Sequence, residues 1–164
     1  MLKELKGKLK KGDGMNIEDY MTEKGKLNHH VEKEAIARGY FKKELSISNN
    51  HEGDPFCYIE NKNNGKKIYY IIGEAGEKET KCAEKIWDRL PDKVRKVFSE
   101  NEENSFWLKI DLWKTKTYIC ASFKEIKKIE TRDNSFTILR SSYNNFENRE
   151  DEKEFIDYIL NKLK

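Results

Sequence analysis

The sequence is poor in proline, histidine and cysteine, with two, three and three residues of these types among 164. The cysteines, Cys57, Cys82 and Cys120, lie far apart and are odd in number, and no CxxC or Cys/His pair has zinc-finger spacing. We therefore expect neither a disulfide framework nor structural zinc, and no other cofactor. Because each cysteine sits in an apolar pattern, we predict core thiols in a cytoplasmic protein.

Long apolar runs and a marked excess of one charge are also missing. No stretch approaches the roughly 20 apolar residues that cross a bilayer, and the N-terminus lacks the apolar segment of a signal peptide. With 33 basic and 30 acidic residues, the net charge of +3 permits a nucleic-acid partner without indicating one. No motif indicates a small-molecule substrate.

The chain does contain enough aromatic residues, 12% of the total, to anchor a core beneath a heavily charged surface. Its length indicates one domain. We predict a basic tail over residues 1–14, where three leucines are spaced among lysines, and a single α+β domain over residues 15–164. The acidic stretch at 100–104 is the one place where this domain could divide into two sub-lobes.

The clearest pattern is SFWLKIDLWK, from Ser105 to Lys114. Apolar side chains alternate strictly with a second set, so the pattern predicts a strand whose two faces differ. One face carries the aliphatic set with Phe106, predicted as core: Phe106, Leu108, Ile110 and Leu112. The other carries Trp107, Lys109, Asp111 and Trp113.

The remaining elements follow from periodicity and from turn or cap residues. Asn63-Asn64-Gly65 predicts a tight hairpin turn, since Asn-Gly supplies the positive φ angles that such turns need. Pro91 divides a long amphipathic pattern into two helices or kinks it. The predicted elements are a helix N-capped by Asn28 and ending at Gly39, a short strand at 41–48, hairpin strands at 56–62 and 66–72, helices at 78–89 and 91–100, strands at 118–123 and 135–141, and a helix at 150–163. This order predicts a mostly antiparallel twisted sheet of about five to six strands, packed against two to four helices.

One cluster of potential metal ligands stands out. His30 and Glu34 would share a helix face at i and i+4, a geometry that can place two ligands on one metal. The surrounding residues do not form an HExxH motif, and such pairs are common on solvated helix faces. A metal site at His30 and Glu34 is therefore an alternative to the simpler interpretation, which has no metal.

Asp54 with Glu60-Asn61-Lys62 is similar to the acidic residue and Glu-x-Lys triplet of the PD-(D/E)XK nucleases. The resemblance implies that Glu34, Asp54 and Glu60 hold Mg²⁺ and that Lys62 poises the attacking water. The spacing departs from the family, because five residues are too few for a strand, a turn and a return. In one extended strand the two carboxylates would stand roughly 20 Å apart. An ordinary hairpin strand with a charged outer face is the favoured interpretation.

Trp107, Lys109, Asp111 and Trp113, with Tyr118 on the neighbouring strand, form a predicted aromatic platform. Such a surface could seat a protein partner or stack nucleobases. It would be available only if the helices at 78–100 and at the C-terminus both pack elsewhere. The leading hypothesis is a small cytosolic binding or regulatory protein, without catalysis, whose macromolecular partner is a protein. The alternatives are the Mg²⁺-dependent nuclease and a nucleic-acid-binding module.

Overall fold

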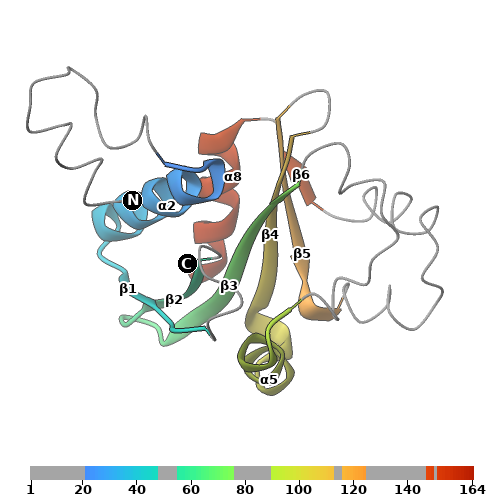
Figure 1. Ribbon diagram of the computed structural model, residues 1–164. Coiled ribbons are helices and arrows are strands. Elements are labelled where there is room, and N and C mark those ends of the chain that lie inside the picture. Colours follow the sequence, from blue (N-terminus) through green and yellow to red (C-terminus); the bar gives the residue numbers. More distant parts are fainter. Residues whose placement is uncertain (1–20, 48–54, 76–89, 113–115, 125–146, 150) are drawn as a thin grey trace, which may run out of the picture.

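A mixed sheet of six strands organises the part of the chain that the computed structural model describes, residues 21–47, 55–75, 90–112, 116–124, 147–149 and 151–164 (Figure 1). The strands lie side by side in chain order, from β1 at one edge to β6 at the other. Four of the five pairings are antiparallel and helices pack on the sheet, so the predicted α+β fold is confirmed. The predicted tail at 1–14, helix at 78–89 and strand at 135–141 lie outside the described residues, as do Asp54, Cys82 and Trp113.

The strands are β1 Phe41–Glu44, β2 Phe56–Asn61, β3 Lys66–Ala75, β4 Ser105–Asp111, β5 Thr117–Ser122 and β6 Glu147–Arg149. Most strands lie where the hydrophobic patterns predict them, but β1 ends four residues before the predicted end, β3 extends three residues further, and β6 was not predicted. The hairpin of β2 and β3 turns at Asn63-Asn64-Gly65 as predicted. Gly65 has φ 76°, a left-handed conformation that glycine adopts without steric cost. The register of this hairpin places Tyr58 opposite Tyr69.

The parallel pair of β3 and β4 sits at the centre of the sheet. Parallel neighbours need a crossover connection, and helix α5 (Asp92–Glu100) lies in it. The helix follows Pro91, as predicted, because proline is tolerated where a helix starts. The acidic stretch at the end of α5 forms a short 3₁₀ helix, η3 (Glu102–Asn104). The strands before and after this stretch, β3 and β4, pair directly and belong to one sheet.

Helices α2 (Glu23–Ala37) and α8 (Glu152–Leu160) lie together on one side of the sheet, away from α5 (Figure 1). Helix α8 continues into the 3₁₀ turn η5 (Asn161–Leu163). Helix α2 begins earlier than predicted, with Thr22 as its N-cap, so the prediction of Asn28 as the cap is wrong. The Asn28 side chain instead accepts hydrogen bonds from Tyr70 Oη at 3.0 Å and Cys57 Sγ at 3.4 Å.

The two faces of the sheet contribute to two separate cores. Alternate residues of β2 to β5 pack under α2 and α8, including Cys57, Ile59, Tyr70, Leu108 and Cys120. Strand residues of the opposite alternation, including Phe56, Ile71 and Ala121, pack with Val94 and Phe98 of α5. Phe106, Leu108 and Ile110 are buried as predicted, whereas Leu112, just beyond the end of β4, is 40% exposed.

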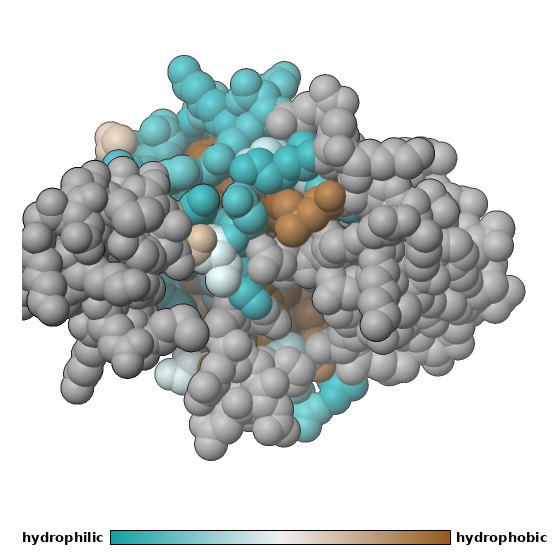
Figure 2. Space-filling view, turned by 45° about the horizontal axis from the view of Figure 1, so that its top comes forward, coloured by the Kyte–Doolittle hydropathy of each residue, from teal (hydrophilic) through white to brown (hydrophobic). Residues whose placement is uncertain are grey.

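The two described cysteines, Cys57 and Cys120, are free and buried, as predicted. In the space-filling view, hydrophilic side chains dominate the coloured surface, and hydrophobic ones show mainly in the hollows between them (Figure 2). Among the described helices, none combines the length and the apolar character that crossing a bilayer requires.

Candidate functional site

The strand register divides the predicted aromatic platform. Tyr118 of β5 lies opposite Ile110 of β4, and directly opposed residues point to the same face of a sheet. Tyr118 is therefore on the aliphatic face, where it is 3% exposed and its ring stacks on Phe155 at 5.5 Å between centroids. Grouping Tyr118 with the tryptophan face was wrong, because alternation within one strand gives no register with the next.

Helix α5 covers part of the tryptophan face. Trp107 is half-buried and packs against the cluster that contains Val94 and Phe98 of α5. Lys109 is only 5% exposed, and its ammonium group lies 5.3 Å from the centroid of the Trp107 ring. The predicted platform required that this helix leave the tryptophan face uncovered. Because α5 packs on this face, Trp107 and Lys109 do not form an open platform. Asp111, half-buried at the end of β4, remains only a predicted contact residue.

An aromatic surface does exist on the same face of the sheet, but on β1 to β3. The Tyr58 ring on β2 contacts the rings of Phe41 on β1 and Tyr69 on β3, with centroids 6.3 Å and 5.1 Å away. Phe41 is 42% exposed, and both tyrosines are half-buried. We call these three rings, with the lysines described next, the aromatic face.

Three exposed lysines border the rings. Lys43 lies opposite Tyr58 in the pairing of β1 with β2, and Lys67 lies opposite Glu60 in the pairing of β2 with β3. Lys62 places its ammonium group 4.4 Å from the centroid of the Phe41 ring, a cation–π contact. Among the described residues of this surface, three ammonium groups thus stand beside one carboxylate, that of Glu60, and this described part of the aromatic face is positively charged.

Tyr58 is held in its neutral form. Burial and the neighbouring Glu60 carboxylate raise the pKa of Tyr58 to about 12. A tyrosine phenol is already protonated at neutral pH, and this shift keeps it protonated under more alkaline conditions as well. The ring then presents an uncharged surface to a ligand, flanked by permanent positive charge.

A basic groove adjoins the aromatic face at the hairpin end of β3. Its volume is about 570 Å³. Lys66, Lys67 and Lys162 line it, together with Glu103 and with Ile68 and Phe106, which belong to the core under α2 and α8. Because Lys67 belongs to both surfaces, the positive charge passes from the aromatic face around the hairpin end of the sheet to this groove on the side of α8.

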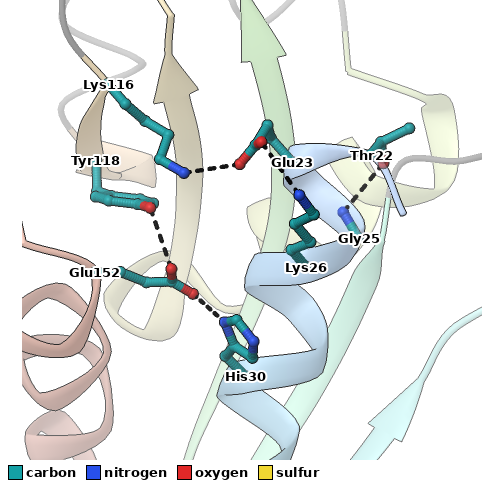
Figure 3. A network of polar contacts seen from close by, with 8 residues as sticks. All are labelled: Thr22, Glu23, Gly25, Lys26, His30, Lys116, Tyr118 and Glu152. Carbon is teal, nitrogen blue, oxygen red and sulfur yellow. Dashed lines mark hydrogen bonds and ion pairs between the residues drawn. The ribbon is translucent and has the colours of Figure 1, made fainter. Parts of the chain in front are cut away.

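The opposite face of the sheet is closed by polar contacts as well as by packing (Figure 3). The Glu152 carboxylate of α8 accepts a hydrogen bond from Tyr118 Oη at 3.3 Å and contacts Nδ1 of His30 on α2. Lys116, just before β5, donates to Glu23 at 2.9 Å. This hydrogen bond lowers the pKa of Glu23 and raises the pKa of Lys116. These contacts tie both helices to β5.

The predicted metal ligands His30 and Glu34 do line one groove, between α2 and α8, but each has another partner. His30 contacts Glu152, and Glu34 accepts a hydrogen bond from Arg38 at 3.1 Å. Within the described residues, no group of three or more His, Cys, Asp or Glu side chains could hold a metal ion.

The two described acidic residues of the nuclease alternative, Glu34 and Glu60, lie on opposite sides of the sheet. Glu60 alternates with Ile59, which packs under α2 and α8, so Glu60 points to the opposite face. Glu34 lies in the helical layer on the first face. The sheet therefore stands between these two carboxylates, and Lys62 contacts Phe41 on the Glu60 side. Asp54 lies outside the described residues.

Comparisons with protein-family models, with curated proteins and with solved structures find no match for this chain.

Sequence reasoning missed the aromatic face, although part of its signal was present. The Asn-Gly turn fixes the hairpin register, and counting outward from it pairs Tyr58 with Tyr69. Phe41 could not be placed in this way, because a longer connection separates β1 from β2 and leaves their register open.

Proposed function

We propose that this protein is a cytosolic binding protein without catalytic activity, which engages a macromolecular partner through the aromatic face of β1 to β3. One observation carries the proposal: three aromatic rings in a row, the central Tyr58 in contact with the other two and Phe41 42% exposed, lie on a sheet surface bordered by three exposed lysines. Adjacent solvent-accessible aromatic side chains are typical of contact surfaces.

The chemistry of this surface suits binding. Neutral rings offer large, rigid contact areas at a small cost in conformational entropy. The lysines add positive charge that attracts a partner and orients it. The placement in the cytosol is supported by two buried cysteines that remain free thiols.

Site-specific photo-crosslinking in the native host tests this proposal. Lys43 is replaced by a photoreactive amino acid, and the matched control carries it at Lys33, an exposed lysine of α2 on the other side of the sheet. We expect a crosslinked macromolecule at position 43 that is absent at position 33. We also expect it to disappear when Tyr58 and Tyr69 are both changed to isoleucine.

Isoleucine is chosen because it is favoured in strands and keeps an apolar side chain, while the ring is lost. The same exchange at Tyr40, which packs against the opposite core, controls for the loss of a half-buried tyrosine. Equal crosslinking from positions 43 and 33, or a crosslink that survives loss of both rings, contradicts the proposal.

A further inference from the structure

We propose that the partner of the aromatic face is single-stranded nucleic acid. A base stacks on the rings, and its phosphates lie along Lys43, Lys62 and Lys67 toward the basic groove. This inference rests on the proposed function and names the class of partner. Charge complementarity between the lysine border and a polyanion carries it.

The amino-acid composition of the surface favours nucleic acid over protein as the partner. Protein interfaces are enriched in aromatic residues but depleted in lysine. Here each of the three strands or their ends contributes a lysine to the border: Lys43 from β1, Lys62 after β2 and Lys67 from β3. Aromatic rings combined with lysines are the chemistry of surfaces that bind single strands.

The geometry places charge on both sides of the central ring. Lys43 lies opposite Tyr58 on β1, whereas Lys67 lies two strands away from β1 and two residues along from Tyr69. With strands about 4.8 Å apart and a rise of about 3.4 Å per residue, these two positions are roughly 12 Å apart. A base on Tyr58 would therefore have an ammonium group available on either side for the flanking phosphates.

The basic groove gives the strand a direction in which to continue. Lys67 is shared by both surfaces, and Lys162 extends the charge beyond it. The Lys162 ammonium group lies 4.3 Å from the Tyr158 ring centroid and 5.0 Å from that of Phe106. Glu103, which also lines the groove, pairs with Lys124, and Lys66 donates to the C-terminal oxygen of Lys164. Lys67 and Lys162 therefore supply the positive charge along this path.

An unpaired strand fits this surface better than a duplex. The bases of a duplex are stacked on one another, so that side chains reach only their edges and the backbone. Rings on an open sheet surface can stack only on bases that are free to leave such a stack. The half-buried state of Tyr58 and Tyr69 also leaves the rings rigidly placed, which lowers the entropic cost of ordering them on binding.

Fluorescence anisotropy of labelled single strands of mixed sequence, about 12 nucleotides long, tests the inference. The full chain is titrated into the RNA form, the DNA form and a DNA duplex of equal length. We expect saturable binding of at least one single strand at low salt and weaker binding of the duplex. Changing Tyr58 and Tyr69 together to isoleucine should weaken single-strand binding by about ten-fold or more, since stacked bases contribute substantially to affinity. Tyr40→Ile should leave it unchanged.

A charge-matched pair of variants separates local from overall electrostatics. Lys62→Gln with Lys67→Gln should reduce the dependence of log affinity on log salt by about 1.4, because each phosphate contact contributes about 0.7 on a single strand. Lys33→Gln with Lys153→Gln removes the same charge from exposed positions on α2 and α8, and it should change this dependence little. Circular dichroism of each variant checks that it is folded.

No binding of either single strand at low salt overturns the inference, and so does binding that loss of the rings leaves intact. Equal effects of the two lysine pairs also contradict it, because binding would then follow net charge alone. If nucleic acid fails while position 43 crosslinks to a protein in a manner that depends on Tyr58 and Tyr69, the inference is wrong and the proposed function stands. If both fail, the aromatic face is not a binding surface.

Discussion

The two faces of the sheet are built from the same strands, yet they are covered very differently. On one face, α2 and α8 bury residues of four strands, from Cys57 on β2 to Cys120 on β5. On the other face, α5 packs with β2, β3 and β5 and partly covers Trp107, while Phe41 on β1 remains exposed. The difference shows that an alternating strand pattern identifies two faces without telling which part of either face is open.

The position of the covering helices therefore decides where a sheet can bind a partner. The tryptophans of the strand pattern are the more conspicuous aromatic residues in the sequence, but the described one, Trp107, lies against the α5 cluster. The less conspicuous Phe41 and Tyr58 are not part of this cluster, whereas Tyr69 packs against it with its ring half-buried. The difference between the two faces can be measured by the free energy of unfolding of variants on each face.

The largest expected difference in stability is between a buried aromatic residue on the covered face and an exposed one on the other face. Phe155 of α8 is fully buried and stacks on Tyr118, so Phe155→Ala should lower the free energy of unfolding by about 3–5 kcal/mol. Phe41→Ala removes an exposed ring from the edge strand and should cost less than about 1 kcal/mol. Urea denaturation followed by circular dichroism measures both values. Similar losses for the two variants would mean that β1 to β3 are covered as fully as the opposite face.

An intermediate effect is expected at the polar contact beneath α2. Asn28→Ala removes the acceptor of the Tyr70 hydroxyl, which belongs to a fully buried side chain, and should cost about 1–3 kcal/mol in the free energy of unfolding. Adding Tyr70→Phe removes the stranded hydroxyl, so the double variant should be less destabilised than the sum of the two single variants. Simple additivity in this double-mutant cycle would show that the contact does not help to close this face.

The smallest effect is expected at the ion pair between α2 and β5. The Lys116 hydrogen bond lowers the pKa of Glu23 below its ordinary value of 4.5. A lowered carboxyl pKa adds stability above the ordinary value, and this stability is lost as the pH falls through the folded pKa. Lys116 is exposed and Glu23 is half-buried near the protein surface, so Glu23→Gln should lower the free energy of unfolding at pH 7 by less than about 1 kcal/mol. The difference from the unchanged protein should shrink on acidification toward pH 3, measured by urea denaturation at each pH. A difference that grows toward low pH would contradict this role.

Much of the fold could be predicted from local patterns. Alternation identified β4 and its aliphatic face, Asn63-Asn64-Gly65 identified the hairpin, and Pro91 marked the start of α5. These signals are strong because each has a local physical cause: side-chain period, positive φ and the missing amide hydrogen of proline. Asn28 was misplaced as a cap because its actual partners, Tyr70 and Cys57, are distant in sequence.

The candidate site was less accessible to sequence reasoning, because it depends on register and coverage. The correct face of the sheet was considered, but its open part lies on other strands. Tyr118 was assigned to the wrong face since a shift of one residue in register reverses every side chain. The amphipathic pattern of α5 shows which side of the helix is buried, but it does not show which part of the sheet that side covers.

The central claim is that the open surface of this protein lies on β1 to β3 and accepts a single strand. Amide chemical shifts of the ¹⁵N-labelled full chain, recorded during titration with a single-stranded DNA or RNA oligonucleotide, test it most directly. We predict that the largest changes occur at Lys43, Tyr58 and Tyr69, while Val31 and Ala35 of α2 stay unchanged. Changes centred on the groove between α2 and α8, or none at low salt, would contradict the account.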